Sequence, residues 1–569
     1  MPTDQKIRLS LYRARQNVDP QPPNRMTTIT LTWKRTLQTL AVAAWSLSAA
    51  LAQSSAATAV QVDATQTLGR LEPFWASQIV HPTEFLLTEW GQRYVRLLKA
   101  TGAARQYIRI YNQPENAVRV MPDGTITYDW SRFDAMADVV LSSGNKLKVV
   151  FFSMPVALAL HPKELYIRES IGAVCCISPP KDYKQWEELC RNFTRHVIEK
   201  YGIDEVKQWL FRCWNEPDYG YWYNKDLPEY LKLYDHFAQG VKSVSPDVKI
   251  GGPALTSIDT YKKPENFRFF LEHVANGVNH ATGKVGSPID YIAVHTYGGS
   301  GARGGPGRSS PAVEFMIEQQ LRYADMRDEF PALRHLPIHV DEWGVASGGY
   351  FLDPKLYTPV RDSEYNAAFL TAWVERHVRM RLEKDRKIEG FTFCALNDYL
   401  WLGDFNGFRT LITKNGFHKP ILNAYKLLAR LAPDLVAVSL EPANRHIYSF
   451  ASRDAERITV VVTNYQEERV LNDGDSHPVR LEVKTPWPNG TRVSVSHWRI
   501  DRTHSNAYTV FKEIGSPKQP SAGQVDAVKK RMELELLRPA QTMPVAELSG
   551  MEWSLPCNGI SLVEIVKRE

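Results

Sequence analysis

Short apolar runs alternate with amphipathic segments between about residues 60 and 430. The apolar runs are nearly continuous, as in LKVVFFSMP and IDYIAVHTYG, whereas the segments between them, such as YKQWEELCRNFTRHVIEKYG, carry apolar residues at three- and four-residue steps. Near-continuous apolar strands separated by helices are typical of a parallel sheet covered on both faces. The strand candidates are residues 106–112, 147–155, 206–217, 248–255, 289–298, 336–344 and 388–398.

About eight such strand–helix units over roughly 350 residues predict an α/β fold, a (β/α)₈ or TIM barrel with inserted loops. A doubly wound open sheet is the structural alternative. That fold carries a glycine-rich phosphate turn after its first strand, and the sequence has none there. The pattern therefore favours the barrel, which we assign to residues 58–430.

The pattern changes after about residue 430. Runs such as RITVVVTNYQ, VRLEVKTP and TRVSVSHWRI are short, alternating and rich in Val, Ile and Thr, and turn residues such as PNGT separate them. This pattern predicts a C-terminal antiparallel β-sandwich over residues 431–569. The early segment AVQVDA, residues 59–64, is also strand-like and is a candidate for the same sandwich.

The N-terminal segment, residues 1–57, has a different character. Residues 26–52 combine a basic start at Lys34 and Arg35, an apolar run, and small residues before Gln53. This is the three-part plan of a secretory signal, and the run is short for a membrane span. We expect a secreted or periplasmic protein whose translation starts at Met1 or Met26; an uncleaved membrane anchor is the alternative.

Composition narrows the classes of partner. The net charge of +6 comes from 69 basic and 63 acidic residues, a weak field for 569 residues. With no long basic block after the N-terminus, we expect no nucleic-acid partner, and no membrane association once the signal is removed. The six cysteines fit no zinc spacing, so we expect no metal or cofactor. Homo-oligomerisation stays open.

Polar residues stand at the ends of the predicted strands, and in a (β/α)₈ barrel the carboxyl ends of the strands form the active site. A lone acid at a strand end is more often a helix cap or a loop ligand. Clusters at matching positions of separate strands favour function instead. They are Arg109, Asn215 with Glu216, His295 with Tyr297, Asp341 with Glu342, and Asn397 with Asp398.

Two of these clusters centre on glutamates, and paired glutamates indicate glycoside hydrolysis. One carboxylic acid protonates the leaving oxygen, and the other carboxylate attacks the anomeric carbon or activates a water. The two roles require different pKa values at the same pH, which mutual repulsion helps to produce.

The sequence also resembles a known family. WNEP, followed by HVDEWG in a later strand, is similar to the barrel glycosidases that place the acid/base on strand four and the nucleophile on strand seven. The stretch from ISPPKDYKQW to WNEPDYGYW is closely similar to glycoside hydrolase family 39, which contains β-xylosidases and α-L-iduronidases. The resemblance continues through NAAFL, FNGFRTLITKNGFHKPILNAYKLL and PSAGQVDAV, and covers nearly everything after residue 65.

The resemblance implies catalytic roles position by position. Glu216 would be the general acid/base, Asn215 would bind the sugar 2-hydroxyl, and Glu342 would be the nucleophile. Asp341 is the rival nucleophile. Because side chains alternate along a strand, we expect only one of Asp341 and Glu342 to point into the barrel.

Further residues are candidates for sugar binding, each with a structural alternative. His295 and Tyr297 lie two apart and face the same way, as sugar ligands or as a packed core pair. Arg109 would steady the nucleophile or pair with a core acid. Trp222 and Trp343 are candidates for a sugar platform or for core packing, and Asp398 or Asp404 for holding the distal hydroxyls, where NDYLWLGD departs from the family pattern.

The leading hypothesis is a retaining, exo-acting β-xylosidase that works on xylo-oligosaccharides or related glycosides by double displacement. Its two carboxyl groups would lie about 5–5.5 Å apart. An α-L-iduronidase is an alternative, for which Arg303, Arg308 and Arg409 are candidate cations for the substrate carboxylate. An endo-acting glycanase and a non-catalytic sugar-binding protein are the others.

Overall fold

The computed structural model describes residues 57–168, 173–219, 223, 226–256, 264–299, 310–348 and 354–568. For residues 166–168, 173–174, 354–356, 398 and 399, only the backbone is described. The predicted signal segment, Trp222, Arg303 and Arg308 lie outside the described residues. Residues 56–569 form one compact unit.

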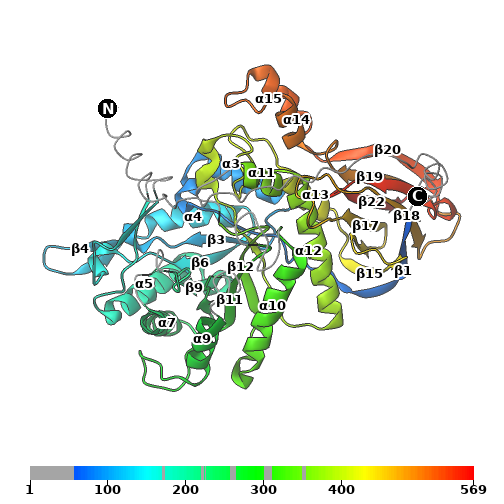
Figure 1. The fold of residues 1–569 in the computed structure, drawn as a ribbon. Helices are drawn as coiled ribbons and strands as arrows, with labels where there is room; N and C mark the ends of the chain where they lie inside the picture. The colour runs from blue at the N-terminus through cyan, green and yellow to red at the C-terminus, as the bar shows by residue number, and fades with distance from the viewer. Residues whose placement is uncertain are drawn as a thin grey trace, which may run out of the picture. The chain divides into compact units, whose positions relative to one another are not determined.

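Eight parallel strand positions close into a barrel, as predicted (Figure 1). β11 pairs with β12, and β14 pairs with β2, which closes the ring. The eighth position is split into β13 and β14, both of which pair with β12. The strands are β2 (Ser77–Ile79), β3 (Tyr107–Tyr111), β6 (Lys146–Phe151), β9 (Leu210–Cys213), β10 (Lys249–Pro253), β11 (Tyr291–Tyr297), β12 (Ile338–Gly344), β13 (Ile388–Glu389) and β14 (Thr392–Phe393).

Helices follow the strands and cover the outside of the barrel. α5 shows why: its apolar stripe includes Trp186, Leu189 and Phe193, Asp182 caps its start, and Gly202, at φ 80°, ends it. The helices are α3 (Glu89–Ala100), α4 (Ser131–Ser142), α5 (Tyr183–Tyr201), α6 (Ile203–Val206), α7 (Leu227–Lys242), α9 (Pro264–Asn276), α10 (Val313–Asp328), α11 (Pro354–Asp362), α12 (Glu364–Glu383) and α13 (Pro420–Leu428). Short 3₁₀ turns lie at Thr83–Leu87, Pro114–Asn116, Val156–Leu158, Pro331–Leu333 and Asn397–Leu402, and two hairpins join β4 (Val118–Val120) with β5 (Ile126–Tyr128) and β7 (Leu165–Arg168) with β8 (Ala173–Cys176).

The two faces of the barrel strands differ in chemistry. On β3, Ile108 and Ile110 belong to the large core shared with the helices, whereas Tyr107 packs in a small cluster with Leu210 and Tyr291 from other strands. Side chains of strands that are not neighbours meet only inside a barrel. The inward positions are therefore those of Tyr107 and, two residues on, Arg109.

The C-terminal region forms one curled, mostly antiparallel sheet with an enclosed apolar core of Val, Ile and Leu side chains. β1 pairs antiparallel with β15 and parallel with β18, so the N-terminal strand lies within this sheet rather than in the barrel. In order across the sheet, the strands are β20 (Glu535–Pro544), β19 (Arg492–Ile500), β22 (Ile560–Lys567), β17 (Arg457–Asn464), β16 (Ile447–Arg453), β15 (Asp434–Glu441), β1 (Thr58–Arg70), β18 (His477–Lys484) and β21 (Met551–Leu555). Helices α14 (Ala507–Glu513) and α15 (Ala522–Lys529) and a 3₁₀ turn at Val545–Glu547 interrupt them.

Helix α12 joins the barrel to this sheet. Most of its side chains are buried, on all of its faces, which is typical of a helix enclosed on both sides. Thr371 of α12 lies 2.8 Å from the Thr463 hydroxyl of β17, and Tyr365 lies 3.0 Å from the Tyr465 hydroxyl. No helix among the described residues is long and apolar enough to span a membrane, and none of the six cysteines forms a disulfide.

Candidate active site

The catalytic candidates lie where the sequence places them, at the carboxyl ends of the barrel strands. Glu216 follows β9, the fourth strand position, and Glu342 lies in β12, the seventh. The chain at Glu216 takes a left-handed turn, with φ of 61° at Trp214 and 47° at Glu216. Residues other than glycine rarely adopt this backbone conformation, and those that do are often found at functional sites. The Glu216 backbone N–H donates to the Ala254 carbonyl, 3.0 Å away, which ties the turn to the end of β10.

Glu216 has one close side-chain partner in this part of the barrel, His295 of β11. The His295 Nδ1 lies 2.9 Å from Glu216 Oε1, and the histidine is fully buried. Its other ring nitrogen has no hydrogen-bond partner among the described residues. The histidine thus fixes one carboxyl oxygen of Glu216 and leaves the other to meet a substrate.

More hydrogen-bond donors surround Glu342 than surround Glu216 among the described residues. Arg109 Nη2 donates to Glu342 Oε2 at 3.1 Å, and the Tyr297 hydroxyl donates a short hydrogen bond to Oε1. Arg409 donates to the Tyr297 hydroxyl at 2.7 Å and lies 3.8 Å from Glu342 Oε1. Both carboxylate oxygens are therefore held by donors that fix the direction in which the group can attack.

The expectation that only one acid of Asp341–Glu342 points inward is wrong. The register of β11 on β12 pairs Val294 with Val340 and then His295 with Glu342, so Asp341 is an extra residue, a β-bulge. Strict alternation fails across a bulge. Asp341 and Glu342 both reach Arg109, while Val340 and Trp343 face the helices.

The surroundings of Glu342 act on its charge. Burial by itself raises the pKa of this carboxyl, but His295, Arg109 and Arg409, together with the Tyr297 hydrogen bond, outweigh burial and hold the pKa well below its usual range. Burial raises the pKa of Tyr297 well above its usual value, so its hydroxyl stays protonated. Glu342 is thus held as a carboxylate at neutral pH, the form that a nucleophile requires.

The two glutamates are close enough to act on one bond. One carboxylate oxygen from each and a ring nitrogen of His295 all lie within 4.8 Å of one another. This spacing suits a retaining glycosidase, because inverting enzymes keep the carboxyl groups about 6.5–9.5 Å apart to admit a water. The three groups are also of the types that ligate metals, as are Asp235, His273 and His280 outside the barrel, but displacement at a sugar by two carboxyl groups requires no metal.

Two predicted residues have more specific partners than the sequence indicated. Asn215, which is buried, accepts a hydrogen bond from Arg212 at 2.9 Å, so its amide nitrogen is the group that can turn to a ligand. Arg109 was expected to steady the nucleophile or to pair with a core acid. It does both, because it contacts Glu342 and Asp341 at once.

Two candidate sugar ligands have structural partners, and for Trp343 the structure favours the core-packing alternative. Trp343 has no exposed surface and stacks on Trp373 at a ring distance of 4.7 Å, because the residue after Glu342 faces the helices. Asp404 accepts hydrogen bonds from the Asn415 backbone and side chain and from Thr413, so it closes its own loop. The Trp222 prediction and the side chain of Asp398 lie outside the described residues.

The sequence analysis missed three inward cations. Arg212 and Lys148 are buried inside the barrel, and Arg409, considered only for a substrate carboxylate, lies beside the nucleophile. A usable signal was present for two of them. Arg212 in LFRCW and Lys148 in LKVVFF are single charges within apolar strands, at positions that alternation assigns to the barrel interior.

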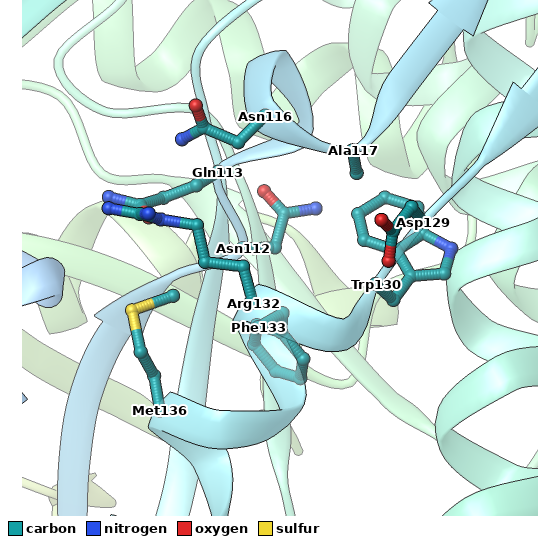
Figure 2. Close-up of a pocket in the computed structure, with 9 residues that line it drawn as sticks. All are labelled: Asn112, Gln113, Asn116, Ala117, Asp129, Trp130, Arg132, Phe133 and Met136. Carbon is teal, nitrogen blue, oxygen red and sulfur yellow. The ribbon is translucent and has the colours of Figure 1, made fainter. Parts of the chain in front are cut away.

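A small hollow lies beside the site, between the end of β3 and the start of α4 (Figure 2). Asn112 and Gln113 line it from the strand side, and Trp130, Phe133 and Met136 from the helix side. It has no room for a water-sized molecule, and neither glutamate lines it. The hollow is therefore not the substrate pocket.

A parallel (β/α)₈ barrel with two glutamates in reach of one bond on strands four and seven defines a glycosidase. The comparisons with known proteins agree. The family model for glycosyl hydrolases family 39 matches residues 58–545, and the chain belongs to this family. It is a retaining glycosidase that hydrolyses O-glycosyl bonds.

The chain is similar to relatives of two kinds, β-xylosidases and α-L-iduronidases. A β-xylosidase of Caldicellulosiruptor saccharolyticus is 26% identical over 84% of this chain and 92% of that protein. An α-L-iduronidase of Mus musculus is 24% identical over 92% of this chain and 83% of that protein. The fold matches that of a monomeric β-xylosidase from Caulobacter crescentus CB15 with a TM-score of 0.74, at 22% identity over 89% of this chain and 99% of that one.

Proposed function

We propose that Glu342 is the nucleophile and Glu216 the general acid/base of an exo-acting β-xylosidase. One observation carries the two roles: carboxylate oxygens of both residues and the His295 ring lie within 4.8 Å of one another, while only Glu342 is ringed by Arg109, Arg409 and Tyr297. Permanent charge suits a nucleophile, and a partner that can exchange protons suits an acid/base.

The reaction proceeds by two displacements. Glu342 attacks the anomeric carbon while Glu216 gives its proton to the departing glycosidic oxygen, so the C–O bond breaks as the glycosyl–enzyme ester forms. Glu216, now a carboxylate, removes a proton from water, and the water oxygen replaces Glu342 at the anomeric carbon. Two inversions give a sugar of retained configuration, and Glu216 regains its proton.

The β-xylosidase assignment is supported by the Caldicellulosiruptor relative, which this chain matches over 92% of the relative's length. The test is hydrolysis of a panel of p-nitrophenyl glycosides of xylose, arabinose, glucose, glucuronate and iduronate, with NMR of the anomer first released. We expect the β-xyloside to have the highest kcat/KM and to release β-xylose. Release of the inverted anomer would exclude the double displacement.

An α-L-iduronidase is a second candidate, and one observation favours it. Arg409 is buried beside Tyr297 and Glu342, where a guanidinium can reach a carboxylate carried by the bound sugar. Its replacement separates the candidates. In Arg409→Gln, an iduronidase loses affinity for the iduronide selectively, whereas a xylosidase loses kcat on the xyloside because Tyr297 and Glu342 are less well held.

We also propose that the protein is secreted or periplasmic, on the strength of the signal-like segment 26–52. Expression of the chain from Met26 in a bacterial host tests this. Edman sequencing of protein from the periplasm or medium should begin at Gln53, and full-length protein confined to the cytoplasm would refute the proposal.

A further inference from the structure

Asp341 lies at the centre of a buried charge cluster beneath the catalytic pair. Its carboxylate is 2% exposed and lies 2.8 Å from Arg212 Nε, 3.4 Å from Arg109 Nη1 and 3.4 Å from Lys148 Nζ. These three cations come from β9, β3 and β6, and Asp341 comes from β12. Charges from four strands thus meet inside the barrel, where water cannot screen them.

Two of the cations continue to the active site, each to a different half of it. Arg109 donates to the Asp341 carbonyl at 2.9 Å and, through its other nitrogen, to Glu342. Arg212 donates to the Asn215 oxygen at 2.9 Å, and Asn215 directly precedes Glu216. The third cation, Lys148, donates to Thr392 and to the Gly390 carbonyl of the eighth strand, so it anchors the cluster to the wall.

We infer that Asp341 is a positioning residue that couples the nucleophile to the group holding the sugar 2-hydroxyl, through Arg109 on one side and Arg212 on the other. The inference rests on the proposed roles of Glu342, Glu216 and Asn215. Its structural basis is the β-bulge in β12, which lets two consecutive acids enter the barrel, one to react and one to order the arginines.

The cluster must be occupied by an anion. Burial raises the pKa of Asp341, but Arg212, Lys148 and Arg109 outweigh burial and keep this carboxyl ionised. Burial lowers the pKa of Lys148 to about 8. An amide in place of Asp341 leaves both arginines without their shared counter-charge, so each is free to turn toward its remaining partner. The positions of Glu342 and Asn215 then become independent.

The test uses Asp341→Asn and two substrates, an aryl glycoside and its 2-deoxy analogue. The ratio of kcat/KM for the two measures how much the enzyme gains from the 2-hydroxyl. We expect Asp341→Asn to lower kcat by about 10- to 100-fold, in line with small misplacements of catalytic groups, and to lower the 2-hydroxyl ratio. Asn215→Ala should lower the same ratio, and the double variant should lower it no further.

Two further variants make the outcome decisive. Asp235→Asn is the matched control: Asp235 is as buried as Asp341 and holds His273, Ser287 and the His280 backbone, but it lies on α7 near the amino end of β11, away from the site. It should reduce stability without changing the ratio. If Asp341→Asn does not fold, Arg212→Lys replaces it, since a lysine lacks the planar fork by which Arg212 reaches Asp341 through Nε and Asn215 through Nη2.

Each result has one meaning. A 2-hydroxyl ratio that Asn215→Ala lowers but Asp341→Asn or Arg212→Lys leaves at the wild-type value overturns the inference, and so does a ratio that Asn215→Ala does not change. Substantial activity in Glu342→Gln would instead refute the proposed catalytic roles. An inactive Glu342→Gln beside a fully active Asp341→Asn would leave those roles intact and remove only the coupling.

Discussion

The two glutamates that we propose as catalytic occupy contrasting surroundings. Glu342 lies within a strand, its side chain is 10% exposed, and two arginines and a tyrosine hold it. Glu216 lies beyond a strand end in a left-handed turn, its side chain is 18% exposed, and His295 is its side-chain partner among the described residues. The first setting stabilises a negative charge on Glu342, and the second leaves Glu216 more exposed, beside a histidine.

The contrast shows that two glutamates of the same barrel differ in their chemical properties because their neighbours differ. The groups that lower the pKa of Glu342 are His295 of strand six, Arg109 of strand two and Arg409 of the loop after strand eight. Glu216 is hydrogen-bonded to the buried His295, and its own side chain is the more exposed of the two glutamates. Acid and base roles thus follow from which strands contribute the neighbours.

The largest effect should come from removing the nucleophile. In Glu342→Gln the amide cannot form the glycosyl–enzyme ester, so we expect kcat on an aryl glycoside to fall by about 10⁴-fold or more. Stopped assays measure this fall in kcat, with the wild-type enzyme as the standard. A residual rate within tenfold of wild type would show that another group attacks.

Replacing Glu216 should have a smaller and leaving-group-dependent effect. Glu216→Ala removes the proton donor, which general acid catalysis values at about 10²–10⁴-fold. The loss should be greatest with poor leaving groups and small for the first step with dinitrophenyl glycosides. Added azide should restore turnover and yield a glycosyl azide of retained configuration. An inverted azide would reverse the two assignments.

The Tyr297 hydroxyl should matter through the charge of Glu342. Tyr297→Phe removes a donor that lowers the pKa of Glu342, so that pKa rises toward the ordinary glutamate value. The acid limb of the kcat/KM profile, where Glu342 becomes protonated, should therefore move to higher pH, with kcat reduced about 10²-fold. Measurement of kcat/KM between pH 3 and 7 checks the direction. An acid limb that stays in place would separate Tyr297 from the charge of Glu342.

The smallest effect should come from Asp404, which the sequence placed with the sugar ligands. Asp404→Asn loses charge-assisted hydrogen bonds within its loop, and we expect about 1 kcal/mol less stability with kcat and KM within twofold of wild type. Thermal unfolding and steady-state kinetics report the two effects. A tenfold rise in KM would return Asp404 to the substrate site.

The barrel, the curled sheet and the two glutamates follow from the sequence because each depends on local order. Apolar runs and three- to four-residue steps define the strands and helices, and a strand's polar end lies at the barrel rim wherever the strand is placed. This rule made Glu216 and Glu342 candidates, and the resemblance to glycoside hydrolase family 39 supplied their expected roles. His295 and Tyr297, two residues apart on one strand, needed only alternation.

The tertiary structure decided what depends on other strands. Asp341 departs from the alternation rule because β11 and β12 pair with a bulge, which is a property of two strands and not of either one. Asp404 accepts a hydrogen bond from Asn415, eleven residues later in the chain, and so closes its own loop. Arg109, Arg212 and Lys148 surround one aspartate because closing the barrel brings together side chains from strands that are far apart in the chain. At these short distances, electrostatic attraction to Asp341 determines where the three cations lie.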